Sequence, residues 1–226
     1  LYRETSNDFE ILRSYKGSTL LIQPYAQYQL RPNQKLTLNL GVHAQTLTLN
    51  NETVVEPRAG LSWNLTEKDR LSFGYGLHSQ IQPIELYFRQ IEVNGVQTTP
   101  NKNIKFNKSH HAVISYQHSF RYGIQAKVEA YYQYLFDVPV ESDSSTFSIL
   151  NFGADFNTAL PSNLVNNGKG RNYGAELTLE KYLDKGFYFL ITTSLYQSLY
   201  TASDGKEYNT AFNGNFTFNS LIGYEL

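Results

Sequence analysis

Residues 124–136 read IQAKVEAYYQYLF, and this stretch decides the fold. Its first, third, fifth and later odd-placed residues are apolar or aromatic, from Ile124 to Phe136. Both charges of the stretch, Lys127 and Glu129, fall on the alternate set. Successive side chains of a β-strand point to opposite faces of its sheet. The alternation therefore predicts a strand with one face toward an apolar medium and the other toward water.

The same period of two recurs on both sides of this strand. The clearest further copies are residues 36–45, 70–78, 173–180 and 215–224. Counted in this way, the chain of 226 residues holds about nine strands, many of ten or more residues. Strands of soluble proteins usually have about five or six residues. Longer strands are what a tilted crossing of a bilayer requires.

The connections between the expected strands alternate between two lengths. Tight turns rich in turn-forming residues are predicted at 31–34, 66–69, 121–123 and 184–186. Longer links are predicted at roughly 49–54, 83–107, 139–169 and 201–213, and the Asn-rich residues 154–168 are interpreted as loop. Aromatic residues crowd the turns at 121–123 and 184–186, as in an interfacial belt. Short turns on one rim and long loops on the other are typical of outer-membrane barrels.

No run approaches the ~20 consecutive apolar residues of a transmembrane helix, and a closed barrel is the other structure that can span lipid. We therefore predict an all-β fold: an antiparallel up-and-down transmembrane β-barrel, present in part, with about nine strands of a larger barrel. Bacterial single-chain barrels have an even number of strands, so nine strands do not close and both edges are left unpaired. We therefore expect the natural protein to continue in both directions. A soluble sandwich or lipocalin-like carrier stays open, because alternation alone does not distinguish lipid from a protein core.

Composition excludes several classes of function. Cysteine is absent, which excludes disulfides, thiolate metal sites and cysteine nucleophiles. The net charge is -1 and the cations are scattered singly, so no nucleic-acid partner is expected.

Several segments together resemble the barrel of TonB-dependent outer-membrane receptors, particularly those of the Bacteroidetes type. They are residues 76–83 (GLHSQIQP) followed by Tyr87-Phe88, residues 108–111 (KSHH), residues 129–140 (EAYYQYLFDVPV), residues 168–180 (GKGRNYGAELTLE) and residues 209–214 (NTAFNG) leading to Asn219 and Glu225. The resemblance lies in their joint order and spacing over about residues 55–226.

The resemblance implies that residues 1–226 are a segment of such a barrel in the outer membrane of a Gram-negative bacterium, in contact with its lipid. It implies active uptake of a nutrient, such as a glycan, a peptide or a metal chelate. The expected partners are that substrate, an N-terminal plug domain and, through the plug, TonB. No plug domain is recognisable in these residues, and neither an enzymatic activity nor a cofactor is expected. The alternative is a different outer-membrane barrel: a porin, an adhesin or a hydrolase active at its rim.

The best candidates for substrate contact are Tyr87, Phe88 and Arg89. They lie in a connection too long for a simple turn, and they place aromatic rings beside a cation. Such a group suits stacking on a sugar or pairing with an anionic chelate. The alternative is that Tyr87 and Phe88 pack on neighbouring loops.

Histidines and acidic pairs indicate no catalytic residues and no metal site. His110 and His111, beside Ser109, suggest a metal site or a hydrolase, but adjacent strand residues point to opposite faces. His43 and His78 fall on the water-facing set and are expected to contact the lumen or the plug. Glu176 and Glu180 share that face, roughly 13 Å apart at ~3.3 Å per residue, which is too far for a glycosidase pair.

Overall fold

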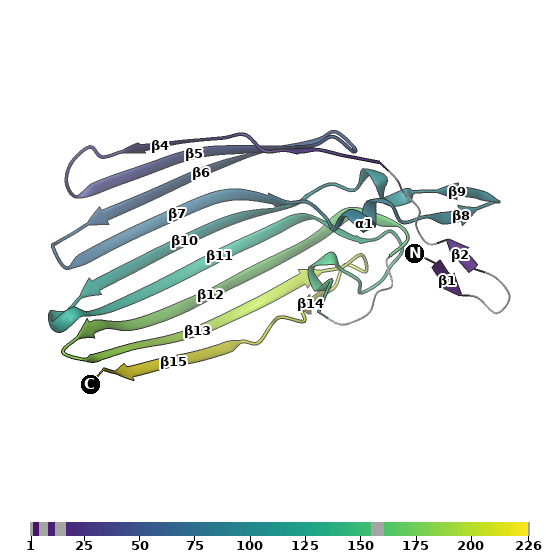
Figure 1. The fold of residues 1–226 in the computed structure, drawn as a ribbon. Helices are drawn as coiled ribbons and strands as arrows, with labels where there is room; N and C mark the ends of the chain where they lie inside the picture. Colours follow the sequence, from purple (N-terminus) through teal and green to yellow (C-terminus); the bar gives the residue numbers. More distant parts are fainter. Residues whose placement is uncertain (1, 5–8, 12–16, 155–160, 226) are drawn as a thin grey trace.

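A computed structural model describes residues 2–4, 9–11, 17–154 and 161–225 of the chain. Most of these residues belong to one large curved antiparallel sheet (Figure 1). Part of the predicted loop at 154–168, residues 155–160, lies outside the described residues.

The strands of the large sheet are β3 (Leu21–Ile22), β4 (Tyr25–Leu30), β5 (Leu36–Leu47), β6 (Glu52–Asn64), β7 (Asp69–Gln80), β10 (Asn107–Ser119), β11 (Ile124–Glu141), β12 (Leu164–Asp184), β13 (Phe187–Thr201), β14 (Glu207–Asn209) and β15 (Phe216–Tyr224). Two small hairpins consist of β1 (Tyr2–Glu4) with β2 (Phe9–Ile11) and of β8 (Ile91–Val93) with β9 (Val96–Thr98). The helical segments are α1 (Ile84–Tyr87), η1 (Pro100–Asn103), η2 (Arg121–Gly123) and η3 (Ile149–Asn151). No helix among the described residues is long and apolar enough to cross a membrane.

Sequence neighbours pair with one another through the large sheet, as an up-and-down topology requires. Strands β3 and β4 both pair with β5, so together they fill one strand position of the sheet, and β14 and β15 do the same beside β13. The described sheet therefore has nine strand positions, as the alternating pattern predicted. Strand β11, which begins with residues 124–136, runs for 18 residues and pairs along most of its length with β10 and β12.

The two ends of the sheet differ, and the predicted alternation of short and long connections is confirmed except at one link. The long link predicted at 49–54 is wrong, because β5 ends at Leu47 and β6 already begins at Glu52. Tight turns lie together at one end, and the long connections lie together with α1, β8 and β9 at the other (Figure 1). The turn between β12 and β13 has only Lys185 and Gly186, with φ of 54° and 79°. Positive φ at both central residues matches the twist of a hairpin and favours glycine.

The loop predicted over residues 154–168 was wrong at its end, because β12 already begins at Leu164. The backbone of Leu164 and Val165 pairs with Glu141 and Val140 of β11. Polar composition does not prevent this pairing, since the amide of Asn166 finds hydrogen-bond partners on other segments. A strand that extends beyond the membrane needs no apolar alternation, which is why the pattern did not reveal it.

The apolar face of the sheet is uncovered over most of its length. Val128 and Leu177 pair across β11 and β12 and expose 49% and 48% of their surface. In a soluble sandwich, such a row would be buried against a second sheet. Among the described residues no such sheet covers it, so the arrangement favours lipid contact over the soluble alternative.

Candidate substrate-binding surface

The long connections share one hydrophobic cluster at their end of the sheet. Its buried members are Leu47, Val54, Leu86, Tyr87, Ile104, Phe106, Val138, Ile149 and Leu164. They come from four strands, α1, η3 and the segment before β10, so the cluster joins links that are far apart in sequence. Burial of these side chains supplies the main driving force that orders the loops.

Tyr87 is a fully buried member of this cluster, with 0% of its surface exposed. Phe88 packs against the cluster, and Arg89 is half-buried at the end of α1. Burial raises the pKa of the Tyr87 hydroxyl to about 12. We call the long connections and their shared hydrophobic cluster the loop layer. The aromatic residues predicted to bind substrate therefore lie within this loop layer. Their direct contact with a substrate stays a prediction.

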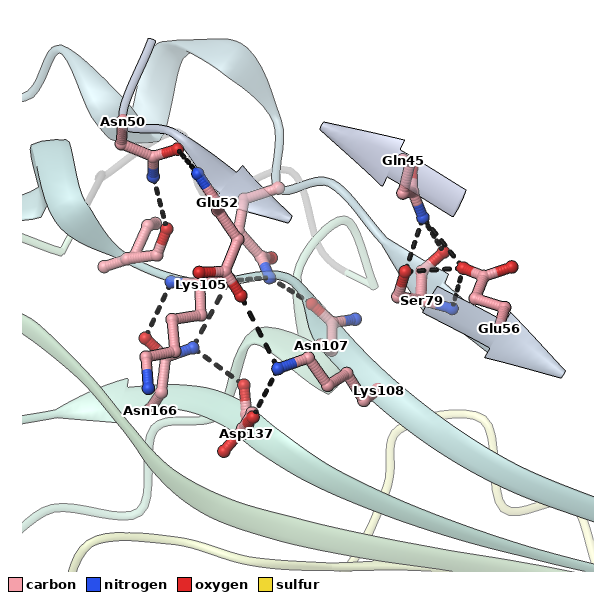
Figure 2. Close-up of polar contacts among 12 residues, drawn as sticks. Gln45, Asn50, Glu52, Glu56, Ser79, Lys105, Asn107, Lys108, Asp137 and Asn166 are labelled. Atoms are coloured by element: carbon pink, nitrogen blue, oxygen red, sulfur yellow. Dashed lines mark hydrogen bonds and ion pairs between the residues drawn. The ribbon is translucent and has the colours of Figure 1, made fainter. Parts of the chain in front are cut away.

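Asparagine side chains tie the loops together by accepting from and donating to backbone groups. The Oδ1 atom of Asn101, a fully buried residue, accepts from Leu164 N at 2.9 Å, and its Nδ2 atom donates to Pro161 O at 3.0 Å. Asn166 accepts from Lys105 N at 2.8 Å and donates to Asp137 O at 2.7 Å (Figure 2). Each amide thus satisfies groups that irregular backbone would otherwise bury without a partner. No feature of the sequence pattern identified these residues.

A lysine joins three strands beneath the same loops. The Lys108 Nζ atom of β10 lies 2.9 Å from Asp137 Oδ2 of β11 and 3.5 Å from Glu52 Oε1 of β6 (Figure 2). These side chains are partly buried, so solvent screens the ion pairs less than it would on an open surface. The outer ends of the strands are therefore held together by charge as well as by packing.

The carboxylate of Glu56 has the densest set of polar contacts on the interior face. Its side chain is only 2% exposed. It lies 2.8 Å from His43 Nδ1 and accepts from Arg58 Nη2 at 2.7 Å and from Gln45 Nε2 at 2.9 Å. It also accepts from Ser79 N at 2.8 Å (Figure 2). Multiple donors are what a buried carboxylate needs in order to stay ionised.

A hollow of about 470 Å³ lies along β4, β5 and β6. Its interior side chains are those of Tyr25, Gln27, Asn39, His43 and Arg58, with Gly41 and Gly60 between them. The hollow offers hydroxyl, amide, imidazole and guanidinium groups to whatever occupies the interior. His43 lies on the water-facing set, as its place in the alternating pattern predicts.

The histidine pair predicted to point apart does so. His111 pairs with Gly76 on the interior face, whereas the His110 ring lies on the apolar face, with its Nδ1 atom 2.9 Å from the Tyr75 hydroxyl. The Ser109 hydroxyl makes no hydrogen bond to either ring. In the described part of the chain, no group of three or more His, Asp or Glu side chains has the geometry of a metal site.

The apolar face has the dimensions of a membrane band. On β12, Lys181 and Arg171 lie ten residues apart on this face, and Leu179, Leu177, Ala175 and Tyr173 lie between them. At ~3.3 Å per residue and a tilt of about 40°, this interval spans roughly 25 Å along the barrel axis. Near the upper limit, the rings of Tyr75, His110 and Phe136 stack with centroids 6.1 and 5.1 Å apart. An apolar band edged by aromatic rings is expected at a membrane interface.

Long tilted strands, an apolar band of this height and loops on one rim define the wall of an outer-membrane β-barrel. Residues 4–223 match the family described as TonB dependent receptor-like, beta-barrel. The chain belongs to this family, whose members are outer-membrane proteins of Gram-negative bacteria. The predicted fold and location are thereby confirmed.

Solved structures with the same fold include two receptors and an iron transporter. The siderophore receptor PirA from Pseudomonas aeruginosa has a TM-score of 0.65 at 14% identity, over 94% of this chain and 38% of PirA. The pyoverdine receptor FpvA of the same species has a TM-score of 0.64 at 14% identity, over 92% of this chain and 28% of FpvA. The FrpB iron transporter from Neisseria meningitidis has a TM-score of 0.62 at 14% identity, over 92% of this chain and 31% of FrpB.

The chain thus spans less than two fifths of the length of these receptors. No curated protein matches its sequence. These comparisons do not test the Bacteroidetes type, which stays a prediction.

Proposed function

We propose that this chain forms part of the wall and outer loops of a receptor that takes up a nutrient through the outer membrane, coupled to TonB. The family assignment supports transport over the porin, adhesin and hydrolase alternatives. The observation that carries the proposal is the ordered loop layer at one end of the wall, tied together by the Asn101 and Asn166 amides. A layer ordered before binding loses less conformational entropy when a substrate docks on it.

A metal chelate is the substrate class that we favour among metal chelates, glycans and peptides. Relatives of the same fold are described as a siderophore receptor, a pyoverdine receptor and an iron transporter. Within the loop layer, Phe88 and Arg89 are the proposed contact residues, and buried Tyr87 positions them by anchoring α1. A guanidinium beside a ring suits an anionic chelate with aromatic groups.

We further propose that a plug domain in the intact receptor meets the interior face. Glu129 and Glu176 lie directly opposite each other on that face, across β11 and β12. Like charges in such a pair are destabilising, and among the described residues Lys127 Nζ, 2.5 Å from Glu129, is the one cation within salt-bridge distance of either. A cationic group of a plug domain would relieve this repulsion.

The test uses the intact receptor in a host that lacks its own receptors for the nutrients supplied. Uptake of labelled ferric siderophores, glycan oligomers and peptides is measured with and without TonB. We expect TonB-dependent uptake of a ferric siderophore, reduced about tenfold or more by Arg89→Gln, which corresponds to about 1.4 kcal/mol. The control is Arg121→Gln, which removes a cation from η2 at the opposite rim. Uptake that persists without TonB would refute the proposed function, and equal uptake by both variants would exclude Arg89 from binding.

A further inference from the structure

Two histidines of neighbouring strands face the barrel interior side by side. His78 of β7 pairs with Ser109 of β10, and Gly76 of β7 pairs with His111 of β10. The two imidazoles are therefore diagonal neighbours, with ring centroids 6.3 Å apart and planes at 61°. The two histidines belong neither to the hydrophobic cluster of the loop layer nor to the apolar membrane-facing band.

Gly76 provides the space in which the His78 ring lies. A Cβ atom at position 76 would be 2.6 Å from His78 Nε2 and 3.2 Å from its Cε1. The imidazole therefore lies over the glycine, with its Nε2 atom toward the row that holds His111. A side chain at this position would push the ring away from its neighbour.

The separation of the rings suits a shared metal ion. A late divalent metal ion lies about 2.0–2.1 Å from an imidazole nitrogen, so one ion can join rings whose centroids are up to about 6.5 Å apart. At 6.3 Å the two nitrogens must lie on nearly opposite sides of the ion, which square-planar Cu²⁺ or Ni²⁺ allows and tetrahedral Zn²⁺ does not. The nearby charges of Glu56 and Arg58 offset each other through their 2.7 Å ion pair, so they add little repulsion toward a cation.

We propose that His78 and His111 bind a late first-row divalent metal ion on the interior wall of the barrel. Two protein ligands leave positions for water or for donor atoms of a passing ligand, as an exchangeable site requires. The site is additional to the proposed uptake function, because it depends on the interior wall alone.

The test is a Cu²⁺ titration of the intact receptor, purified in detergent and followed by electron paramagnetic resonance. We expect one site with nitrogen hyperfine structure that disappears in the variant carrying His78→Gln and His111→Gln. Each single substitution should weaken Cu²⁺ binding about tenfold or more. The matched control is His110→Gln, which removes the adjacent imidazole on the opposite face. Gly76→Ala should also weaken binding, although it keeps both ligands.

Equal weakening by His110→Gln and His111→Gln would overturn the proposal, as would an unchanged number of Cu²⁺ sites in the double variant. Circular dichroism and resistance to heat in detergent identify variants that have not folded. If one histidine variant fails to fold, Cu²⁺ binding by the other histidine variant and by Gly76→Ala tests the proposal instead. Uptake of ferric siderophore is assayed separately. Loss of uptake with the Cu²⁺ site intact would count against the proposed function alone.

Discussion

The backbone N–H of Ser79 donates to Glu56 Oε1 at 2.8 Å, just above the point where the ladder between β6 and β7 ends. The last paired residues of that ladder are Arg58 and Gly76. Beyond this pair, toward the long connections, the Glu56 carboxylate accepts the Ser79 N–H hydrogen bond that a strand carbonyl would accept in a continuous ladder. A side chain thus closes the outer end of the β6–β7 seam.

Replacement of this carboxylate should loosen the seam. Glu56→Gln keeps the size of the side chain but turns an NH₂ group toward surrounding donors, so we expect a loss of about 1–3 kcal/mol in the free energy of unfolding. The amide of Ser79 should exchange with deuterium faster. Urea unfolding of the receptor in lipid vesicles and hydrogen-exchange mass spectrometry measure both effects. Glu67→Gln, in an exposed turn, is the control, and equal effects would contradict the role of Glu56.

Charge on the two faces of β12 should have different costs. Leu177 lies near the middle of the apolar band, and Thr178 is the next residue on the interior face. Arginine at the bilayer midplane costs about 2–4 kcal/mol, so Leu177→Arg should lower stability by that amount. Thr178→Arg should cost clearly less, because its guanidinium meets a polar interior. Unfolding in vesicles compares the two, and the reverse order would show that the faces have been assigned wrongly.

Two interior glycines should differ in their tolerance of a methyl group. A Cβ at Gly174 would lie 2.6 Å from Leu195 O, whereas the nearest atom to a Cβ at Gly60 would be 3.9 Å away. We expect Gly174→Ala to lose about 1–3 kcal/mol through overpacking. Gly60→Ala should be neutral or slightly stabilising, since alanine restricts the unfolded chain. Melting of both variants in the same detergent tests the difference, and matched melting temperatures would contradict it.

The loop layer should weaken at high pH through Tyr87. Burial raises the pKa of its hydroxyl to about 12 in the folded state, against about 10 in the unfolded chain. A raised pKa means that the stabilisation is complete below pH ~10 and is lost as the pH rises toward ~12. The protection of amides in the 81–106 link, measured relative to their intrinsic base-catalysed exchange, should therefore fall over this interval. Tyr87→Phe keeps the packing and should remove this component of the pH dependence; an unchanged profile would contradict the assignment.

The predictions made from sequence were most successful where they rested on local periodicity. Residues 124–136 form a strand because their own alternation sets the two faces, whatever lies beside them. The turns at Lys185-Gly186 and Tyr122-Gly123 were also predicted from local sequence, since the glycine of each adopts positive φ without steric cost. Residues 164–168 were assigned wrongly because their pairing with β11 lies outside the alternating region.

The sequence by itself determined the strands, their two faces and the rims with short and long connections, because side-chain direction follows the backbone period of each strand. Only the tertiary structure decided which side chains meet. Glu56 and Ser79 are 23 residues apart, and Asn101 and Leu164 are 63 residues apart. Such contacts depend on the register between strands and on the path of the loops, and no periodicity within one segment encodes either. The burial of Tyr87 and the approach of His78 to His111 belong to this second group.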